Sequence, residues 1–160
     1  MQPTIYVIAT TFEGTRAALA TAVPLAKGSG SRLVVMVPRI VPYAVALDTQ
    51  VESTAFFAKR YHDLVEELGG DARIEVCVCR SPEAVVARVD AVGSTIVLGG
   101  PAGRWLTSPE ERFASRLSRL GRTVIFVASG PNPTRPRTAP SVAAVLAVVT
   151  LLLEASRSGL

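Results

Sequence analysis

The residues of this chain that could do chemistry form a glycine-rich loop between an apolar run and a helix-start signal. The run from Thr95 to Leu98 leads into Gly99 and Gly100, and Gly103 follows after two further residues. Glycine has no Cβ, so such a loop lets backbone N–H groups come close to a ligand, and the N-terminus of the next helix attracts anions. This junction therefore indicates phosphate binding.

The start of the following helix argues against an ordinary phosphate site. Ser108 is a candidate N-cap, Pro109 suits the first helical position, and Glu111 completes a capping box with Ser108. Glu110 and Glu111 also place negative charge where a phosphate would sit, and like charges repel strongly in a partly desolvated cleft. The same segment thus suggests a nucleotide site and disfavours it.

No catalytic set can be assembled from the other reactive residues. The one histidine, His62, is expected to be exposed and has no nucleophile as a partner, and no metal-ligand spacing is present. Cys77 and Cys79 lie two apart in an apolar run, so on a strand they point to one face and are expected to be buried, reduced thiols. We therefore expect a protein that is not an enzyme.

Arginines concentrate in the last third of the chain, where residues 104 to 137 include seven arginines and only two glutamates. Arg112, Arg116 and Arg119 follow helical spacing and form one stripe. The stripe could bind ligand phosphates, nucleic acid or an acidic membrane surface, or it could be a solvated helix face without a partner. Nucleic acid is the least supported partner, because no aromatic platform accompanies the arginines.

Five apolar, β-rich runs alternate with helical patterns and would position these residues. Their nearly continuous hydrophobicity is typical of strands covered on both faces. The expected strands are Thr4–Thr10, Arg32–Val37, Arg73–Cys79, Thr95–Leu98 and Thr123–Ala128.

Four helices are expected between the strands. The first runs from Glu13 to Lys27 and ends at Gly28, and the second opens with a capping box at residues 49–52. The third is capped by Ser81, and the fourth follows Ser108 with an apolar stripe of Phe113, Leu117 and Leu120.

Strict alternation of strands and helices predicts an α/β fold, a five-stranded parallel doubly wound sheet with helices on both faces. In such sheets ligands bind beyond the carboxyl ends of the strands, where the winding direction reverses. The glycine loop lies at that end.

Residues 1–129 are expected to form this α/β domain, 130–140 a Pro-rich linker, and 141–160 an apolar C-terminal helix or tail. The 13 residues from Ser141 to Leu153 span about 20 Å as a helix, short of the ~30 Å hydrocarbon core. The alternatives are docking on the domain or a second copy, membrane association, the stump of a longer membrane region, and disorder or aggregation. Without a secretory signal, a cytoplasmic location is expected.

The order of elements and the glycine loop resemble the universal stress protein family over residues 4 to 128. The resemblance implies a five-stranded, commonly dimeric α/β fold. In one branch it implies ATP binding through two glycines separated by two residues, then nine residues, then glycine and serine or threonine. Gly100 and Gly103 match the first half, whereas Phe113 and Ala114 stand where the second half should be.

The other implied binding positions are also altered. Thr11 stands where the family has an aspartate at the end of the first strand, and Pro38 occupies the backbone position that contacts adenine. Thr107 and Ser108 could replace the missing hydroxyl residue. The candidate nucleotide-binding residues implied by the resemblance are Thr11, Pro38, Gly100, Gly103, Thr107 and Ser108.

These observations predict a non-catalytic regulatory or binding module of the stress response, with ATP binding weakened or lost and no cofactor expected. It would be a homodimer through its last strand, with a possible protein partner or membrane contact through its tail. One alternative keeps ATP or another adenine nucleotide, with Arg104 or Arg112 offsetting the glutamates. Another is a membrane-tethered accessory or sensory domain.

Overall fold

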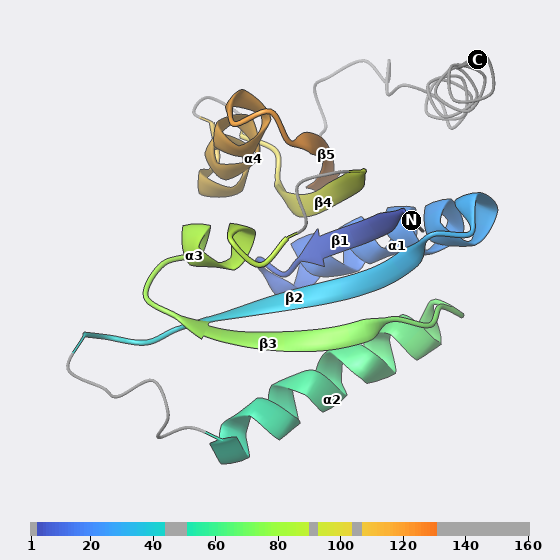
Figure 1. Ribbon diagram of the computed structural model, residues 1–160, viewed down its shortest axis with the longest axis horizontal. Helices are drawn as coiled ribbons and strands as arrows, with labels where there is room; N and C mark the ends of the chain where they lie inside the picture. The colour runs from blue at the N-terminus through green and yellow to red at the C-terminus, as the bar shows by residue number, and fades with distance from the viewer. Residues whose placement is uncertain (1–2, 44–50, 90–92, 104–106, 131–160) are drawn as a thin grey trace. The chain divides into compact units, whose positions relative to one another are not determined.

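The computed structural model describes residues 3–43, 51–89, 93–103 and 107–130, and residues 1–130 form one compact unit. Strands and helices alternate along it, as the sequence predicts (Figure 1). In chain order, the elements are β1 (Thr4–Ile8), α1 (Phe12–Ser29), β2 (Arg32–Ile40), α2 (Val51–Glu67), β3 (Arg73–Cys79), α3 (Glu83–Val86), β4 (Ser94–Pro101), α4 (Pro109–Arg119) and β5 (Thr123–Ser129).

The five strands form one sheet in the order β3-β2-β1-β4-β5, and every neighbouring pair is parallel. β1 is the central strand, with Tyr6 opposite Val34 of β2 and Ile96 of β4. The chain winds outward from β1 to β3, returns to β4 on the other side, and ends at β5. The predicted doubly wound parallel sheet is therefore confirmed, and its winding reverses between β1 and β4.

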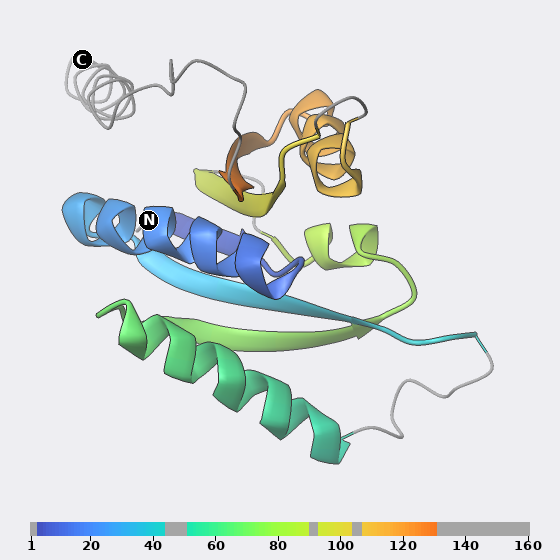
Figure 2. The same cartoon turned by 180° about the vertical axis from the view of Figure 1, so that it is seen from behind.

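Side chains of each central strand alternate between two buried clusters, one on each face of the sheet. Val7 faces the side covered by α1 and α2, where it joins Leu19 and Val65. Ile8 faces the side covered by α3 and α4, where it joins Val85 and Leu117. Figure 2 shows the sheet from behind, with α1 lying along it.

Helix α1 is longer than the sequence predicts. It continues past Gly28 to Ser29 and ends at Gly30, which adopts the left-handed conformation with φ 64°. Pro24 lies within the helix on its exposed side, where water can hydrate the backbone carbonyl that proline leaves without a donor. The predicted end at Gly28 is wrong because Gly28 has ordinary helical backbone.

The other helices agree with the sequence in part. α3 has only four residues, and Pro82, not the predicted Ser81, is its N-cap, with no side-chain cap. α4 has the predicted capping box of Ser108 and Glu111. Leu120 is 68% exposed and does not continue the apolar stripe as predicted, because α4 ends at Arg119.

The capping residue predicted for α2, Thr49, lies outside the described residues, as do the tail and all of the predicted linker except Gly130. Within the described part of the chain, no helix combines the length and apolar character needed to cross a membrane.

Candidate functional site

The candidate site is the carboxyl edge of the sheet at the point where the winding reverses. β1 pairs with its neighbours only as far as Ile8, opposite Met36 and Leu98, whereas β2 continues to Ile40 and β4 to Pro101. Beyond Ile8 no strand continues the central position, and the chain turns into α1. Strand pairing therefore ends earlier at β1 than at β2 and β4, and this is the edge at which ligands bind in doubly wound sheets.

Pro38 lies on β2 beyond the last pair with β1 and is partly buried. It pairs with Cys77 of β3, while β1 has already ended. A proline is tolerated here because no strand on the β1 side requires its missing N–H group. Pro38 therefore lies at the predicted edge, and β2 extends beyond its predicted end at Val37.

Three threonines shape the turn from β1 into α1. Thr11 is the N-cap of α1, and its hydroxyl accepts a hydrogen bond from the Gly14 N–H at 3.1 Å. The buried Thr15 hydroxyl donates to Thr11 O at 2.7 Å and accepts from the Thr10 N–H at 3.0 Å. Thr11, the candidate replacement for the family aspartate, thus already has a capping role.

Thr10 connects this turn to β4. Its hydroxyl donates to the Gly99 carbonyl at 2.5 Å. At the same point α1 and β4 approach each other closely: a Cβ built on Gly99 would lie 1.9 Å from the Gly14 oxygen, and one built on Gly14 would lie 2.5 Å from the Gly99 oxygen. Both positions therefore require glycine for helix-to-strand packing.

Gly99 and Gly100 belong to β4, which the sequence predicts to end at Leu98. They pair with Val127 and Ala128 of β5 and so lie within the sheet, not in the predicted loop. β4 continues because β5 supplies a ladder partner as far as Ser129. In the structure, both positions require glycine because neighbouring groups lie where a side chain would be.

The group that approaches Gly100 is the side chain of Glu110. A Cβ at Gly100 would lie 2.7 Å from Glu110 Cβ and 2.8 Å from its Cγ. Glu110 Oε2 is buried and has no hydrogen-bond partner among the described residues. The side chain of Glu110 thus packs on Gly100, the first glycine of the nucleotide-binding pattern, at the N-terminus of α4, where that pattern would place a phosphate.

The N-terminus of α4 has few amide groups to offer an anion. Glu111 accepts from the Ser108 N–H, and the Ser108 hydroxyl accepts from the Glu111 N–H, both at 3.1 Å. Pro109 has no N–H group. Of the first three helical positions, only Glu110 keeps an N–H group that the capping box does not use.

The remaining candidates lie around this edge. Gly103 and Thr107 are exposed, and residues 104–106 between them, which include Arg104, lie outside the described residues. Ser108, although buried, uses its hydroxyl for the helix cap. The structure therefore places Thr11, Pro38 and Gly100 at one edge, without showing an arrangement of all six candidates around a ligand.

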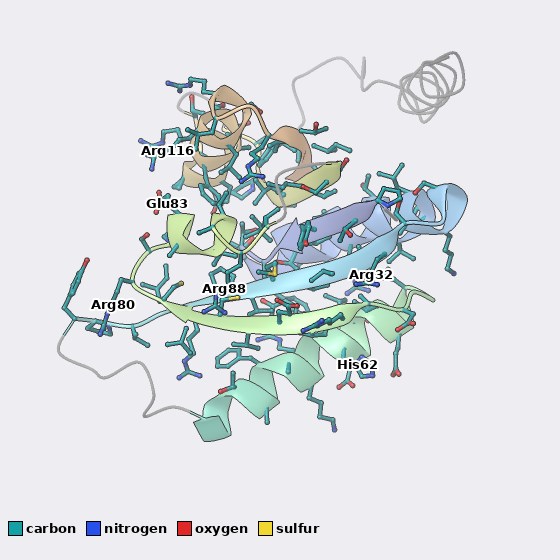
Figure 3. All side chains as sticks on the ribbon, viewed as in Figure 1. Arg32, His62, Arg80, Glu83, Arg88 and Arg116 are labelled. Carbon is teal, nitrogen blue, oxygen red and sulfur yellow. The ribbon has the colours of Figure 1, made fainter. Side chains whose placement is uncertain are left out.

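The three arginines of the predicted stripe on α4 differ in their contacts. Arg112 and Arg119 are exposed, whereas Arg116 bonds to Glu83 of α3 at 2.5 Å (Figure 3). A cation that sequence reasoning missed lies at the end of β2. Arg39 stacks over the Phe57 ring at 5.0 Å, and its Nη1 is buried without a hydrogen-bond partner among the described residues.

One hollow of the described surface lies away from this edge. A groove of about 670 Å³ lies at the opposite, amino-terminal end of β2 and β3, where Arg32 and Arg73 contribute to its lining. No predicted site residue lines it.

The cysteines are buried and free, as predicted, and share the α3/α4 face. Burial raises the pKa of the Cys77 thiol above its usual value, partly offset by the positive charge of Arg88. Burial likewise raises the pKa of Cys79, and Cys77 adds to the effect. Both groups are thus neutral thiols at neutral pH. His62 is exposed, as predicted, and lies 3.3 Å from Glu66.

No protein-family model and no curated protein matches the chain. Solved structures do match it. A universal stress protein from Archaeoglobus fulgidus is 14% identical with a TM-score of 0.56, and the match covers 79% of this chain and 99% of that one.

Two similar structures hold nucleotides. A universal stress protein in complex with cAMP is 18% identical with a TM-score of 0.54, over 81% of this chain and 100% of the other. The Archaeoglobus fulgidus protein in complex with dAMP is 15% identical with a TM-score of 0.50, over 79% and 98%. At such identities the likeness shows the fold, and it confirms the predicted resemblance to universal stress proteins at that level.

Proposed function

We propose that this chain, which has the universal stress protein fold, is a non-catalytic regulatory or binding module in which nucleotide binding is weakened or lost. The observation that carries the proposal is the contact between Glu110 and Gly100. Because glycine has no side chain, Gly100 leaves space at the end of β4, and the Glu110 side chain occupies that space.

Charge and hydrogen bonding act in the same direction as this contact. Glu110 and Glu111 both lie in the first turn of α4, so a triphosphate there would meet two carboxylates. The capping box of Ser108 and Glu111 occupies two of the amide groups that would otherwise offset this repulsion. Each lost amide contact removes about 1.5–3 kcal/mol from the binding of a charged group.

Nucleotide binding is tested by the thermal unfolding of the purified chain with millimolar ATP, AMP or cAMP and magnesium. We expect no change in Tm for the wild type. Glu110→Gln removes the charge and keeps the packing, whereas Glu110→Ala also removes the side chain beyond Cβ from the space over Gly100, so the pair separates repulsion from steric filling. Glu66→Ala, an exposed carboxylate on α2, is the matched control.

A rise in the Tm of the wild-type chain with any of these nucleotides would contradict the proposal. If Glu110→Ala and Glu110→Gln both remain unresponsive, Glu110 is not what closes the site, and the supporting observation is removed.

The second candidate function is adenine nucleotide binding at this edge, through Thr11, Pro38, Gly100, Gly103, Thr107 and Ser108. It is favoured by the nucleotide complexes of two similar structures and by the buried Nη1 of Arg39, which follows Pro38 and has no hydrogen-bond partner among the described residues. If the wild type does bind, Arg39→Gln should weaken binding, and Arg119→Gln, an exposed arginine of α4, should not.

We further propose that the chain dimerises through β5. This strand is an edge of the sheet, and its apolar residues from Val124 to Val127 are only partly buried. Exposed edges of this kind pair readily with another strand. Sedimentation should give a dimer, and Thr123→Lys combined with Ala128→Lys should give a monomer because the two copies repel. Glu66→Lys on α2 should leave the dimer intact.

We also propose a cytoplasmic location and a contact of residues 141–160 with a protein partner or a membrane. Fractionation and sizing of the full chain against a form that ends at Ser129 tests them. Equal solubility and equal size of the two forms would remove the proposed tail contact.

A further inference from the structure

Strand β3 forms one edge of the sheet, and among the described residues only β2 pairs with it. An edge strand presents a row of unpaired N–H and C=O groups on its outer side. Burial of β3 is also incomplete, because Cys77 and Cys79 are the only buried residues of the strand. The outer side of β3 therefore offers main-chain hydrogen bonds to an extended segment.

The α3/α4 face of this edge carries arginines. Cys77 and Cys79 belong to the buried cluster on that face. Because the side chains of a strand alternate, Arg73 and Glu75 point to the same face. Arg73 is exposed, and its Nε lies 2.9 Å from Glu75 Oε1. Arg88 follows α3, is exposed, and has its Nη1 3.6 Å from Cys77 Sγ.

Arg32 lies on the same face of β2, because Val34, two residues later, belongs to the same cluster. Val34 is level with Arg73, so Arg32 lies before the start of β3. α3 has only four residues and α4 packs on β4 and β5, so both helices leave this part of the face open. Figure 3 shows the labelled Arg32 and Arg88 along β2 and β3.

Arg32, Arg73 and Arg88 form an arginine row along the edge of the sheet. From the level of Arg32 to that of Cys77, beside Arg88, the row extends over about 20 Å at the rise of a strand. Three guanidinium groups are accompanied on these strands by one carboxylate of the same face, Glu75, so the row is positively charged. Its length matches an extended peptide of about six or seven residues.

The opposite face of the same edge is apolar. Ile74 and Val76 pack against the cluster under α2 and remain partly exposed. A strand added beside β3 would place alternate side chains beside the arginine row and beside these two residues. The edge therefore selects a peptide in which acidic and apolar residues alternate.

Two other occupants fit this edge less well. A second copy of β3 would bring another arginine row close to the first, and like charges repel. Proteins that bind single-stranded nucleic acid stack bases on aromatic side chains, and the arginine row contains none. The other edge strand, β5, contains no charged residue between Thr123 and Ser129, so the two edges of the sheet differ in charge.

We propose that β3 binds an acidic, extended segment of a partner protein by strand addition. Arg73 and Arg88 pair with carboxylates of the segment, and Ile74 and Val76 contact its apolar side chains. Arg32 contributes less, because it lies on β2, one strand further from the segment. Glu75 competes with the segment's carboxylates for Arg73.

The probe is a fluorescent peptide of about seven residues in which glutamate and valine alternate, and its binding to the full-length chain is followed by fluorescence anisotropy. We expect saturable binding that weakens in high salt. A peptide of the same composition with its glutamates in one block, and one with lysine in place of glutamate, should bind about tenfold or more weakly.

Methylation of peptide nitrogens tests the main-chain hydrogen bonds. Residues of an added strand face β3 alternately, so either the glutamate or the valine nitrogens donate to it. One of two peptides, methylated on the glutamate or on the valine nitrogens, should lose binding. If both bind as tightly as the unmethylated peptide, strand addition is overturned.

Surface variants test the assigned charges without disturbing the core. Arg73→Gln and Arg88→Gln should each weaken binding about two- to fivefold, as expected for exposed ion pairs. Arg32→Gln should have a smaller effect, and Glu75→Gln should strengthen binding because it frees Arg73. Arg119→Gln, an exposed arginine of α4, is the matched control and should have no effect.

Hydrogen exchange locates the bound peptide. Amides of β3 should gain protection on binding, and amides of β5 should not. The proposal is overturned if the alternating peptide does not bind, if the block peptide binds as tightly, or if the protection appears in β5. Binding of a thymidine oligonucleotide in place of the peptide would assign the row to nucleic acid, and protection of β3 on concentrating the free chain would assign it to a second copy. Either result would also overturn the proposal.

Discussion

Gly14 and Gly99, 85 positions apart in the sequence, meet backbone to backbone where α1 crosses the end of β4. A Cβ at Gly99 would lie 1.9 Å from the Gly14 oxygen. Because that oxygen belongs to the backbone, the movement of a flexible side chain could not make room for the Cβ. The Thr10 hydroxyl donates to the Gly99 carbonyl at the same point. The start of α1 and the end of β4 are therefore in direct backbone contact at the carboxyl edge of the sheet.

Gly99→Ala should destabilise the protein by about 3 kcal/mol or more, because a backbone atom must move. Gly28→Ala is the matched control. It lies in α1, and a Cβ at Gly28 would have no neighbour within 4 Å, so the substitution should stabilise by about 0.5–1 kcal/mol. Urea unfolding followed by circular dichroism measures both, and equal effects of the two substitutions would contradict the assigned contact.

Ser108→Ala should lower the free energy of unfolding by about 1 kcal/mol, because it removes the acceptor for the Glu111 N–H. Ser115→Ala, an exposed serine in the middle of α4, should change it little. Comparable losses from the two would show that the capping box does not stabilise α4.

Stability should fall in alkaline solution because of the cysteines. Burial raises the pKa of both thiols above 9.0 in the folded state. Below pH 9 the thiols are neutral whether folded or unfolded, so they cause no pH dependence there. Above it the unfolded chain releases protons that the folded chain holds, so stability is lost as pH rises.

The alkaline loss is measured as urea midpoints from pH 7 to pH 10 under reducing conditions. A Cys77→Ala, Cys79→Ala double variant should show a shallower decline than the wild type between pH 9 and pH 10. Parallel curves would assign the decline to other groups.

Arg116 and Glu83 join α4 to α3 at the surface. Their contact of 2.5 Å involves side chains that are 60% and 43% exposed, so solvent screens it. A double-mutant cycle with Arg116→Ala and Glu83→Ala should give a coupling of about 0.2–1 kcal/mol that decreases in high salt. A coupling that salt does not change would contradict this assignment.

The sequence predicted the elements where a local pattern decides them. The apolar runs located all five strands, and Ser108 and Glu111 specified the start of α4, because a capping box forms between residues three apart. The end of β4 was predicted too early, at Leu98, because its last pairs depend on β5. Leu120 was assigned to the core because helical spacing does not show where the helix ends.

For other residues of the site, the sequence contains little that indicates their role. Gly14 near the start of a helix, where glycine is unfavourable, was a hint of close packing, but its partner could not be named. The buried Thr15 and the buried Arg39 Nη1 had no distinguishing signal. Their roles follow from neighbours on other elements.

By itself, the sequence determined the alternating parallel architecture, the capped start of α4 and the shared face of Cys77 and Cys79, because periodicity and short-range hydrogen bonding specify these. Only the tertiary structure decided that Glu110 covers Gly100 and that Met36 joins the cysteines. Those contacts depend on strand register and on where each helix crosses the sheet. Both are determined by interactions between residues that are distant in the sequence.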